Sequence, residues 1–426
     1  SGAISAAGKP LVVNTDGTVS VVSSSPDSLG TEVAVATTDS FWYQAVYDTA
    51  QDKVLFIYAG NSNYGTAVVG TVSGTSISFG TPTVFISSNS SYLAAAYDSN
   101  AGKTAIFWND AGDSNQQKGI VATISGTSVS FGSAATFSTN NTGTPAKDAT
   151  FDSSQNKLLI AYTDGSSSAK VIAGTISGTS ISFGTGVEFL STDSGSIAIE
   201  YDVNAGKSLV TYVNSDNSNK IDSKVVSLSG DSVSLGSQTN VYNASADKLA
   251  IAYDSTNTKL VATYRPNSGT TLMHFIVATI SGTSVSYGTG VSSGVDFNES
   301  TPINLFNYNV FANKVIFAGR DDGNSYIQKY VSARVSGTSI TMDTPVTYYS
   351  NTSDSYVSCS TYDPDQQKSV LFYADGTAGA YKNPIARVLT LGSGDNLTTE
   401  NFIGTSAHSA ADGAKILVNT QGAVDE

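Results

Sequence analysis

The chain has 426 residues, of which 13% are charged, and its formal net charge at pH 7 is −14. The sequence has no basic stripe, so we expect no nucleic-acid binding. No apolar run approaches the ~20 residues of a membrane span, so we expect no membrane insertion. Cys359 is the only cysteine, which excludes an intrachain disulfide, and we expect it to be buried in a strand. Apolar residues make up 40% of the chain, enough for a packed core, and abundant Ser, Thr, Gly, Val and Tyr favour strands and turns.

The N-terminal segment, residues 1–27, includes residues 13–19, which we interpret as a hairpin that turns at Asp16-Gly17. Residues 28–36 follow, and they resemble residues 78–85, which lie in a predicted strand of a later repeat. We therefore predict that a strand near 31–36 pairs with the last repeat of the chain and completes it.

A motif then recurs seven times: an aromatic residue, usually followed by Asp, and a Lys six positions after the aromatic. The copies are Tyr47…Lys53, Tyr97…Lys103, Phe151…Lys157, Tyr201…Lys207, Tyr253…Lys259, Tyr308…Lys314 and Tyr362…Lys368. The internal spacing never changes, and the lysines of successive copies are 50–55 residues apart. The chain is therefore a tandem repeat.

Each repeat is predicted to contain four antiparallel strands. In the second copy these strands cover residues 92–97, 103–108, 119–124 and 129–137, with a Ser-Gly-Thr-Ser hairpin turn at 125–128 and an expected bulge at Gly132. Four-stranded repeats of this length are typical of propeller blades, and closure into a ring removes exposed sheet edges. The prediction is an all-β, seven-bladed β-propeller of four-stranded antiparallel blades over residues 28–396, closed by the N-terminal strand.

The C-terminal segment, residues 397–426, contains a second predicted hairpin at 418–424 that resembles residues 13–19. Both hairpins lie outside the repeats. Two interpretations stay open, a two-stranded cap and an attachment element for neighbouring subunits.

The loops of a repeat fall into a constant set and a variable set. The turns after the first and third strands are nearly constant, so we interpret their Asp and Lys as scaffold. The other loops vary, and recognition concentrates in variable loops on a rigid framework. Aromatic rings beside Asn and Asp suit sugar stacking and hydrogen bonding to hydroxyls, with rim packing as the alternative for each ring. The candidate binding residues are Trp42, Tyr64, Tyr92, Trp108, Asp110, Arg265, Arg320, Asp322 and Tyr381.

Patterns that carry metal or catalytic chemistry are missing from the sequence. The two histidines are far apart, so no zinc pattern exists, and no P-loop or nucleophile elbow occurs. Asp110 and Asp113 could bind Ca²⁺, but a solvated turn is the favoured interpretation. Glu and Arg are scarce, which disfavours a propeller glycosidase with paired carboxylates. We predict no enzymatic activity, no metal and no cofactor.

One resemblance to a known family rests on the amino-acid sequence of residues 69–82, Val-Gly-Thr-Val-Ser-Gly-Thr-Ser-Ile-Ser-Phe-Gly-Thr-Pro. This segment resembles the repeat of tail-fibre-like and virion appendage proteins of marine bacteriophages, and residues 16–22, 397–404 and 411–414 resemble their flanks. The resemblance implies a location on the virion, contacts with other virion proteins through the terminal segments, and contact with the host surface. Fibre proteins are often trimeric, so a homotrimer is one expected assembly.

The favoured hypothesis is a non-enzymatic virion protein, a tail fibre or a head or tail appendage. Its propeller would recognise a host surface receptor, expected to be a glycan, through the variable loops. A purely structural decoration or spacer, a polysaccharide-active propeller glycosidase and a bacterial surface adhesin are the alternatives.

Overall fold

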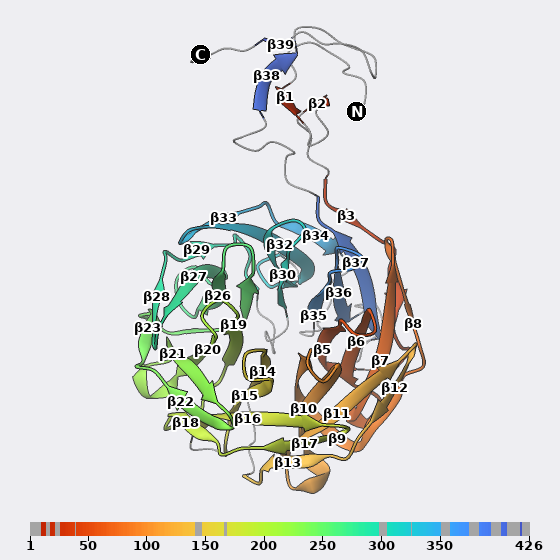
Figure 1. Ribbon diagram of the computed structural model, residues 1–426, viewed down its shortest axis with the longest axis vertical. Coiled ribbons are helices and arrows are strands. Elements are labelled where there is room, and N and C mark those ends of the chain that lie inside the picture. The colour runs from red at the N-terminus through yellow and green to blue at the C-terminus, as the bar shows by residue number, and fades with distance from the viewer. Residues whose placement is uncertain are drawn as a thin grey trace. The chain divides into compact units, whose positions relative to one another are not determined.

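The computed structural model divides the chain into two compact units, residues 29–389 and residues 1–28 together with 390–426 (Figure 1). The residues that the structure describes are 10–13, 18–21, 26–38, 40–140, 147–165, 168–297, 305–324, 326–350, 358–374, 383–392, 402–406 and 418–419. Among them, no helix is long and apolar enough to cross a membrane.

The terminal unit is built around a four-stranded antiparallel sheet in the order β2-β1-β38-β39. Its strands are β1 (Pro10–Val13), β2 (Val19–Val21), β38 (Phe402–Ser406) and β39 (Val418–Asn419). The predicted pairing on either side of Asp16-Gly17 is confirmed, because Val13 is opposite Val19. The turns of both predicted hairpins lie outside the described residues. The two ends of the chain meet in this sheet through the pairing of β1 with β38.

In the larger unit, the first strand of each repeat ends at the Asp or Asn of the motif. These first strands are β5 (Phe41–Asp48), the second half of β9 (Thr83–Asp98), β14 (Lys147–Asp152), β19 (Ile197–Asp202), β25 (Ile251–Asp254), β30 (Phe306–Asn309) and β35 (Ser358–Asp363). In the fifth repeat a short strand, β24 (Ala246–Asp247), precedes β25.

The second strand of every repeat begins at the motif lysine, so the constant spacing of the motif is the length of the first turn. The second strands are β6 (Lys53–Ala59), β10 (Lys103–Asp110), β15 (Lys157–Thr163), β20 (Lys207–Asn214), β26 (Lys259–Pro266), β31 (Lys314–Asp321) and β36 (Lys368–Ala374).

The third strands run back and end at the hairpin turn in six repeats. They are β7 (Tyr64–Ser73), β11 (Gln116–Ser125), β16 (Ala169–Ser177), β21 (Lys220–Ser229), β27 (His274–Ser281), β32 (Ile327–Ser336) and, in the seventh repeat, β37 (Pro384–Thr390). Short 3₁₀ turns precede three of them: η1 (Asn61–Asn63), η2 (Ala111–Asp113) and η3 (Ser215–Asn217).

The outer strand is interrupted, and in the second repeat the interruption covers residues 132–134, beginning at Gly132, where a bulge was expected. Its first part is β8 (Ser76–Phe79), β12 (Ser128–Phe131), β17 (Ser180–Phe183), β22 (Ser232–Leu235), β28 (Ser284–Tyr287) or β33 (Ser339–Met342). Its second part is the first half of β9, β13 (Ala135–Ser138), β18 (Val187–Leu190), β23 (Thr239–Tyr242), β29 (Val291–Ser292) or β34 (Val346–Tyr349). The predicted all-β class and four-strand repeat agree with this order.

The N-terminal strand pairs with the seventh repeat, as predicted. Strand β3 (Ser28–Leu29) and strand β4 (Val33–Ala34) both pair with β37. The Val35 amide donates to the carbonyl of Pro384, and the Gly30 amide donates to that of Val388, both at 2.8 Å. The seventh repeat therefore takes its outer strand from the other end of the chain.

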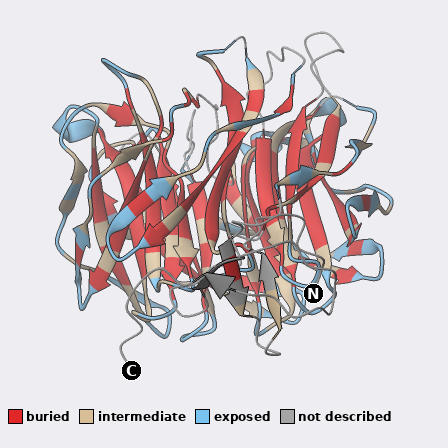
Figure 2. Cartoon of the chain, turned by 90° about the horizontal axis from the view of Figure 1, so that it is seen from above, coloured by how far each residue is buried: buried red, intermediate tan, exposed pale blue. Residues whose placement is uncertain are grey.

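The first strands lie toward the centre of the unit in Figure 1, as β5, β14, β19, β30 and β35 show, while β8, β12, β22, β28 and β33 lie at the periphery. Each first strand contacts the first strand of the next repeat, and β35 contacts β5. Figure 2 shows buried residues concentrated in the strands and exposed residues in the loops at their ends.

The core is a series of apolar layers, each formed between neighbouring repeats. Phe56 of the first repeat stacks on Phe372 of the seventh, with ring centroids 4.4 Å apart and planes 7° apart. Phe107 of the second repeat packs with Leu158 and Ile160 of the third. Cys359 is buried in the layer between the seventh and first repeats, as expected.

The motif residues hold the turns, which agrees with their interpretation as scaffold. Asp98 Oδ1 accepts hydrogen bonds from the amides of Asn100 (2.9 Å) and Ala101 (2.8 Å), closing the first turn of its repeat. Lys103 donates to the Thr123 hydroxyl on the third strand at 2.9 Å. The aromatic residue adds a link between repeats, because the Tyr97 hydroxyl accepts from the Ala50 amide at 3.0 Å.

The glycine at the interruption of the outer strand is required by a close approach. A Cβ atom on Gly132 would lie 1.7 Å from the carbonyl oxygen of Thr179, in the hairpin turn of the next repeat. Gly30 in the N-terminal strand is required for the same reason. A Cβ atom on Gly30 would lie 1.8 Å from the carbonyl oxygen of Thr75, in the hairpin turn of the first repeat. The constant Ser-Gly-Thr-Ser turn thus packs against the neighbouring repeat.

Candidate functional site

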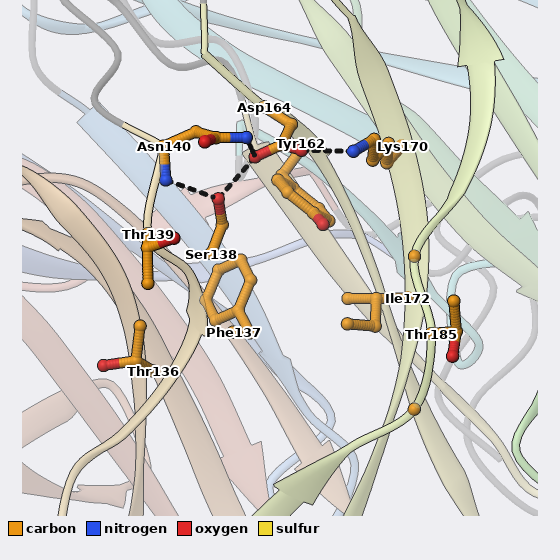
Figure 3. A pocket seen from close by; sticks show the side chains of 12 residues that line it. Thr136, Phe137, Ser138, Thr139, Asn140, Tyr162, Asp164, Lys170, Ile172 and Thr185 are labelled. Atoms are coloured by element: carbon orange, nitrogen blue, oxygen red, sulfur yellow. Dashed lines mark hydrogen bonds and ion pairs between the residues drawn. The ribbon is translucent and has the colours of Figure 1, made fainter.

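A pocket of about 440 Å³ lies between the outer strand of the second repeat and the third repeat (Figure 3). One wall is β13 with the residues that follow it, and the other is formed by the ends of β15 and β16. The side chains that matter chemically are Phe137, Ser138, Asn140, Tyr162, Asp164 and Lys170.

Asp164 is the centre of the polar part of this pocket. Its Oδ1 atom accepts hydrogen bonds from the Ser138 hydroxyl and, at 3.1 Å, from the Asn140 side-chain amide. Its Oδ2 atom accepts from Lys170 in a charged pair. Figure 3 shows these three donors converging on the carboxylate from two neighbouring repeats.

The ionisation of Asp164 follows from this environment. Burial alone would raise the pKa of the carboxyl, but hydrogen bonds from Lys170, Ser138 and Asn140 and the lysine charge outweigh burial and lower the pKa. The carboxylate is therefore charged at neutral pH. Three of its roughly four acceptor positions are occupied, and Lys170 has donors left over. A ligand hydroxyl can donate to the carboxylate and accept from the lysine.

Aromatic rings form the apolar part of the pocket. The half-buried ring of Phe137 meets Tyr162 edge to face, with centroids 5.1 Å apart, and lies 5.2 Å from Phe183. Tyr162 is five residues after the motif lysine, a position that is aromatic in six of the seven repeats. These residues are Tyr58, Trp108, Tyr162, Tyr212, Tyr264 and Tyr373.

A second pocket, of about 590 Å³, occupies the corresponding place where the N-terminal strand meets the first repeat. Residues 35–38 take the place of the outer strand, and Tyr58 takes the place of Tyr162. Gly60 and Thr66 stand where the first pocket has Asp164 and Lys170, because Thr66 is opposite Tyr58 as Lys170 is opposite Tyr162. The two pockets each have a tyrosine at the same position of the repeat, and they differ in their polar groups.

The structure places Tyr64 in this second pocket, with 36% of its surface exposed, so one sequence-based candidate lines a cavity. The expectation that the ring of Trp108 is exposed is wrong. It is fully buried, packing against Phe85 at 5.3 Å, because it occupies the aromatic position of the second strand. It therefore serves as core and is not available for stacking on a sugar.

Asp110 holds the same place in the second repeat as Asp164 in the third, seven residues after the motif lysine. Lys118 lies 2.9 Å from Asp110 and 2.6 Å from Asp113, so one lysine pairs with both carboxylates. The favoured interpretation of this acidic pair as a turn agrees with these contacts. Within the described ranges, no group of three or more His, Cys, Asp or Glu is placed to hold a metal ion.

The two candidate arginines belong to internal ion pairs at the fifth and sixth repeats. Arg265 lies 2.7 Å from Asp296. Arg320 is fully buried, 2.5 Å from Asp322, and its guanidinium lies 4.6 Å from the centre of the Tyr326 ring. The expectation that Arg320 is exposed for ligand contact is therefore wrong. Tyr381 lies outside the described residues.

Trp42 and Tyr92 form a pair at the start of the first strands of two neighbouring repeats. Their ring centroids are 4.1 Å apart, and both rings are half-buried. Both residues have left-handed backbone angles, with φ of 57° and 53°. The structure thus brings these two candidates together, and neither is among the lining residues of the first pocket.

The residues of the first pocket were missed by the sequence analysis, which concentrated on aromatic residues and arginines in loops. The available signal was positional. Asp164, like Asp110 and Asp321, is the seventh residue after a motif lysine, and a lysine follows it six to eight residues later.

Comparisons with known proteins were informative only at the level of the fold. No family model and no curated protein matches the chain. The BP39L lectin from Burkholderia pseudomallei is a similar solved structure, with a TM-score of 0.63 and 10% identity, covering 86% of this chain and 100% of that chain. The β-propeller domain of Cps50 (Swd1) from Myceliophteria thermophila has a TM-score of 0.51 and 7% identity, covering 84% and 99% of the two chains. A protein of unknown function from Dyadobacter fermentans has a TM-score of 0.51 and 10% identity, covering 86% and 99%. The chain has a β-propeller-like fold.

Proposed function

We propose that this protein binds carbohydrate, and that the pocket around Asp164 is a sugar-binding site. The observation that carries the proposal is the pocket itself, in which aromatic side chains stand beside a charged Asp-Lys pair. Such a combination suits a sugar, because a sugar ring has an apolar face and its hydroxyls both donate and accept hydrogen bonds. The similarity to a lectin in fold supports the proposal.

The second pocket extends the proposal to more than one site. It repeats the tyrosine but offers Thr66 and the exposed ring of Tyr64 where the first pocket offers charges. Two pockets on one rigid scaffold would bind a branched or repeated surface glycan with avidity, even if each site is weak.

We further propose that the seven repeats form a closed, seven-bladed propeller. Three observations support closure. The contact of Gly30 with Thr75 repeats that of Gly132 with Thr179. Strand β35 contacts β5, as the other neighbouring first strands contact each other. The Tyr47 hydroxyl donates to Asp365 of the seventh repeat at 3.0 Å.

The biological setting of this binding is proposed from the resemblance of the repeats to bacteriophage appendage proteins. In that setting the protein is a virion component, the glycan belongs to the host surface, and the terminal unit connects the protein to other virion proteins. Immunogold labelling of particles from a phage that encodes the chain tests the location. Labelling of host cells alone would contradict it.

The binding test uses a glycan array of bacterial surface sugars, followed by calorimetry with the best ligand. Asp164→Asn and Lys170→Met should each weaken binding roughly 10- to 100-fold, because a hydrogen bond to a charged group is worth about 1.5–3 kcal/mol. The matched control is Asp231→Asn. Asp231 pairs with Lys157 at 2.7 Å, so this variant also breaks an Asp-Lys pair of β15, at the other end of the strand.

Unchanged affinity in both pocket variants would refute the site. No glycan on the array and no binding to host cells would refute carbohydrate recognition and leave the spacer hypothesis. Release of reducing ends from a bound polysaccharide would instead support the glycosidase alternative.

A further inference from the structure

A cavity of about 470 Å³, here called the inner cavity, lies among the first strands of five repeats, apart from the two pockets described above. Its lining comes from β5, β19, β25, β30 and β35 and from the turns that follow the last three. The lining side chains with distinctive chemistry are Glu200, Tyr253, Asn307, Tyr308, Ser360 and Tyr362.

Three of these residues are motif aromatics. Tyr253, Tyr308 and Tyr362 are each the last residue but one of a first strand. The Tyr308 hydroxyl is held by hydrogen bonds to Thr256 at 2.6 Å and Asn313 at 2.8 Å. The Tyr308 hydroxyl is thus engaged with residues of the turns, while Tyr308 also lines the cavity.

The fourth repeat contributes the carboxyl group. Glu200 lies on β19, immediately before the motif residue Tyr201. It is therefore one residue further from the first turn of its repeat than the motif tyrosine is. It accepts hydrogen bonds from the Tyr201 amide at 3.0 Å and from the Thr150 hydroxyl at 3.2 Å. None of the ion pairs among the described residues includes Glu200.

We propose that the inner cavity binds a small alkylammonium cation, with Glu200 as its counter-ion and the three tyrosine rings around its alkyl and ammonium groups. A cation of this kind is attracted both by the faces of aromatic rings and by a carboxylate. A neutral ligand of the same shape gains little binding energy from either interaction. Asn307 and Ser360, whose side chains are 2.6 Å apart, supply polar oxygens to the same cavity. The acidic net charge of −14 favours the approach of cations.

The charged surroundings of Glu200 predict a pH dependence. Burial raises the pKa of its carboxyl to about 7, although hydrogen bonds from Tyr201 and Thr150 oppose the shift. Asp148 on the neighbouring β14 is also buried, which raises its pKa, and the charge on Glu200 adds to that rise. Lys147 on the same strand is engaged with Asn109 at 2.6 Å. The titrating group of the cavity is therefore Glu200.

The probe is n-butylammonium, compared with the uncharged 1-butanol of the same chain length, in calorimetric titrations of the full chain. The affinity for n-butylammonium should rise roughly tenfold between pH 6 and pH 8, because a carboxyl with a pKa near 7 becomes ionised over that range. Glu200→Gln should weaken binding at pH 8 at least tenfold and abolish the pH dependence. Glu188→Gln, which changes an exposed glutamate on β18, should leave both unchanged.

Circular dichroism establishes that each variant is folded, and Tyr253→Leu is a second variant that removes a ring and keeps the carboxyl. It should also weaken binding. The proposal is overturned if the wild type shows no saturable binding of n-butylammonium at pH 8. It is also overturned if 1-butanol binds equally well, or if Glu200→Gln binds like the wild type. The pH series on the wild type needs no variant to fold.

Discussion

Truncation of Phe372 tests whether the seventh and first repeats are joined as other neighbouring repeats are. Phe372 is fully buried, stacks on Phe56, and lies 6.3 Å from Phe79 with 58° between the rings. Phe107 is its counterpart in the second repeat, four residues after the motif lysine in both cases, and lies 6.3 Å from Phe183 at 59°. Both rings therefore have the same place in a layer between repeats.

Phe372→Ala and Phe107→Ala should each lower the free energy of unfolding by about 3–5 kcal/mol, because both remove a fully buried ring and leave a cavity. Equilibrium denaturation in urea, followed by circular dichroism and by tryptophan fluorescence, gives this quantity if the two signals coincide. A closed ring requires the two losses to agree within about 2 kcal/mol, the spread that such truncations show in different cores. A loss below about 1 kcal/mol for Phe372→Ala, beside a full loss for Phe107→Ala, would refute closure.

Three further predictions concern stability. The pKa of Glu200 is raised to about 7 from an ordinary value of 4.5, so the folded chain retains a proton that the unfolded chain has lost between these pH values. The free energy of unfolding should therefore fall as pH rises from about 4.5 through 7, by about 3 kcal/mol, and thermal melts of Glu200→Gln should lack most of that fall. Trp108→Ala should cost about 3–5 kcal/mol in urea denaturation while the folded fraction binds sugar like the wild type, since the ring is core. Gly30→Ala should cost about 1–3 kcal/mol by differential scanning calorimetry, because the new Cβ would meet the Thr75 carbonyl at 1.8 Å; an unchanged melt would contradict that packing.

The scaffold could be predicted from the sequence because each motif residue acts locally. Asp98 caps its own turn, Lys103 begins the second strand, and the five residues between the motif aromatic and the lysine set the length of that turn. Such contacts depend on residues close in the chain, so their spacing survives in every copy. The N-terminal strand could be predicted for a related reason, since Gly30 repeats the pattern of Gly80 in the first repeat.

The candidate site could not be predicted in the same way, because its walls come from two repeats. Ser138 and Asn140 belong to the second repeat, while Asp164 and Lys170 belong to the third. The spacing of residues within one repeat does not show that side chains of two neighbouring repeats come together. Burial was the second obstacle, because Trp108 in the sequence looks like a loop-proximal aromatic, and only the packing of neighbouring sheets shows that it is enclosed.

The turns that follow the first strands contain both constant residues and variable residues, so they are not scaffold alone. The Asp and Lys of these turns are structural in the contacts seen, but the residues between them differ from repeat to repeat. Val310 in the sixth repeat and Pro364 in the seventh line the inner cavity, and Val310 and Phe311 are each about half exposed. The corresponding positions of the first repeat are Thr49 and Ala50. A search restricted to the variable loops would find the two pockets between repeats and miss the inner cavity, so both ends of the sheets have to be tested for ligands.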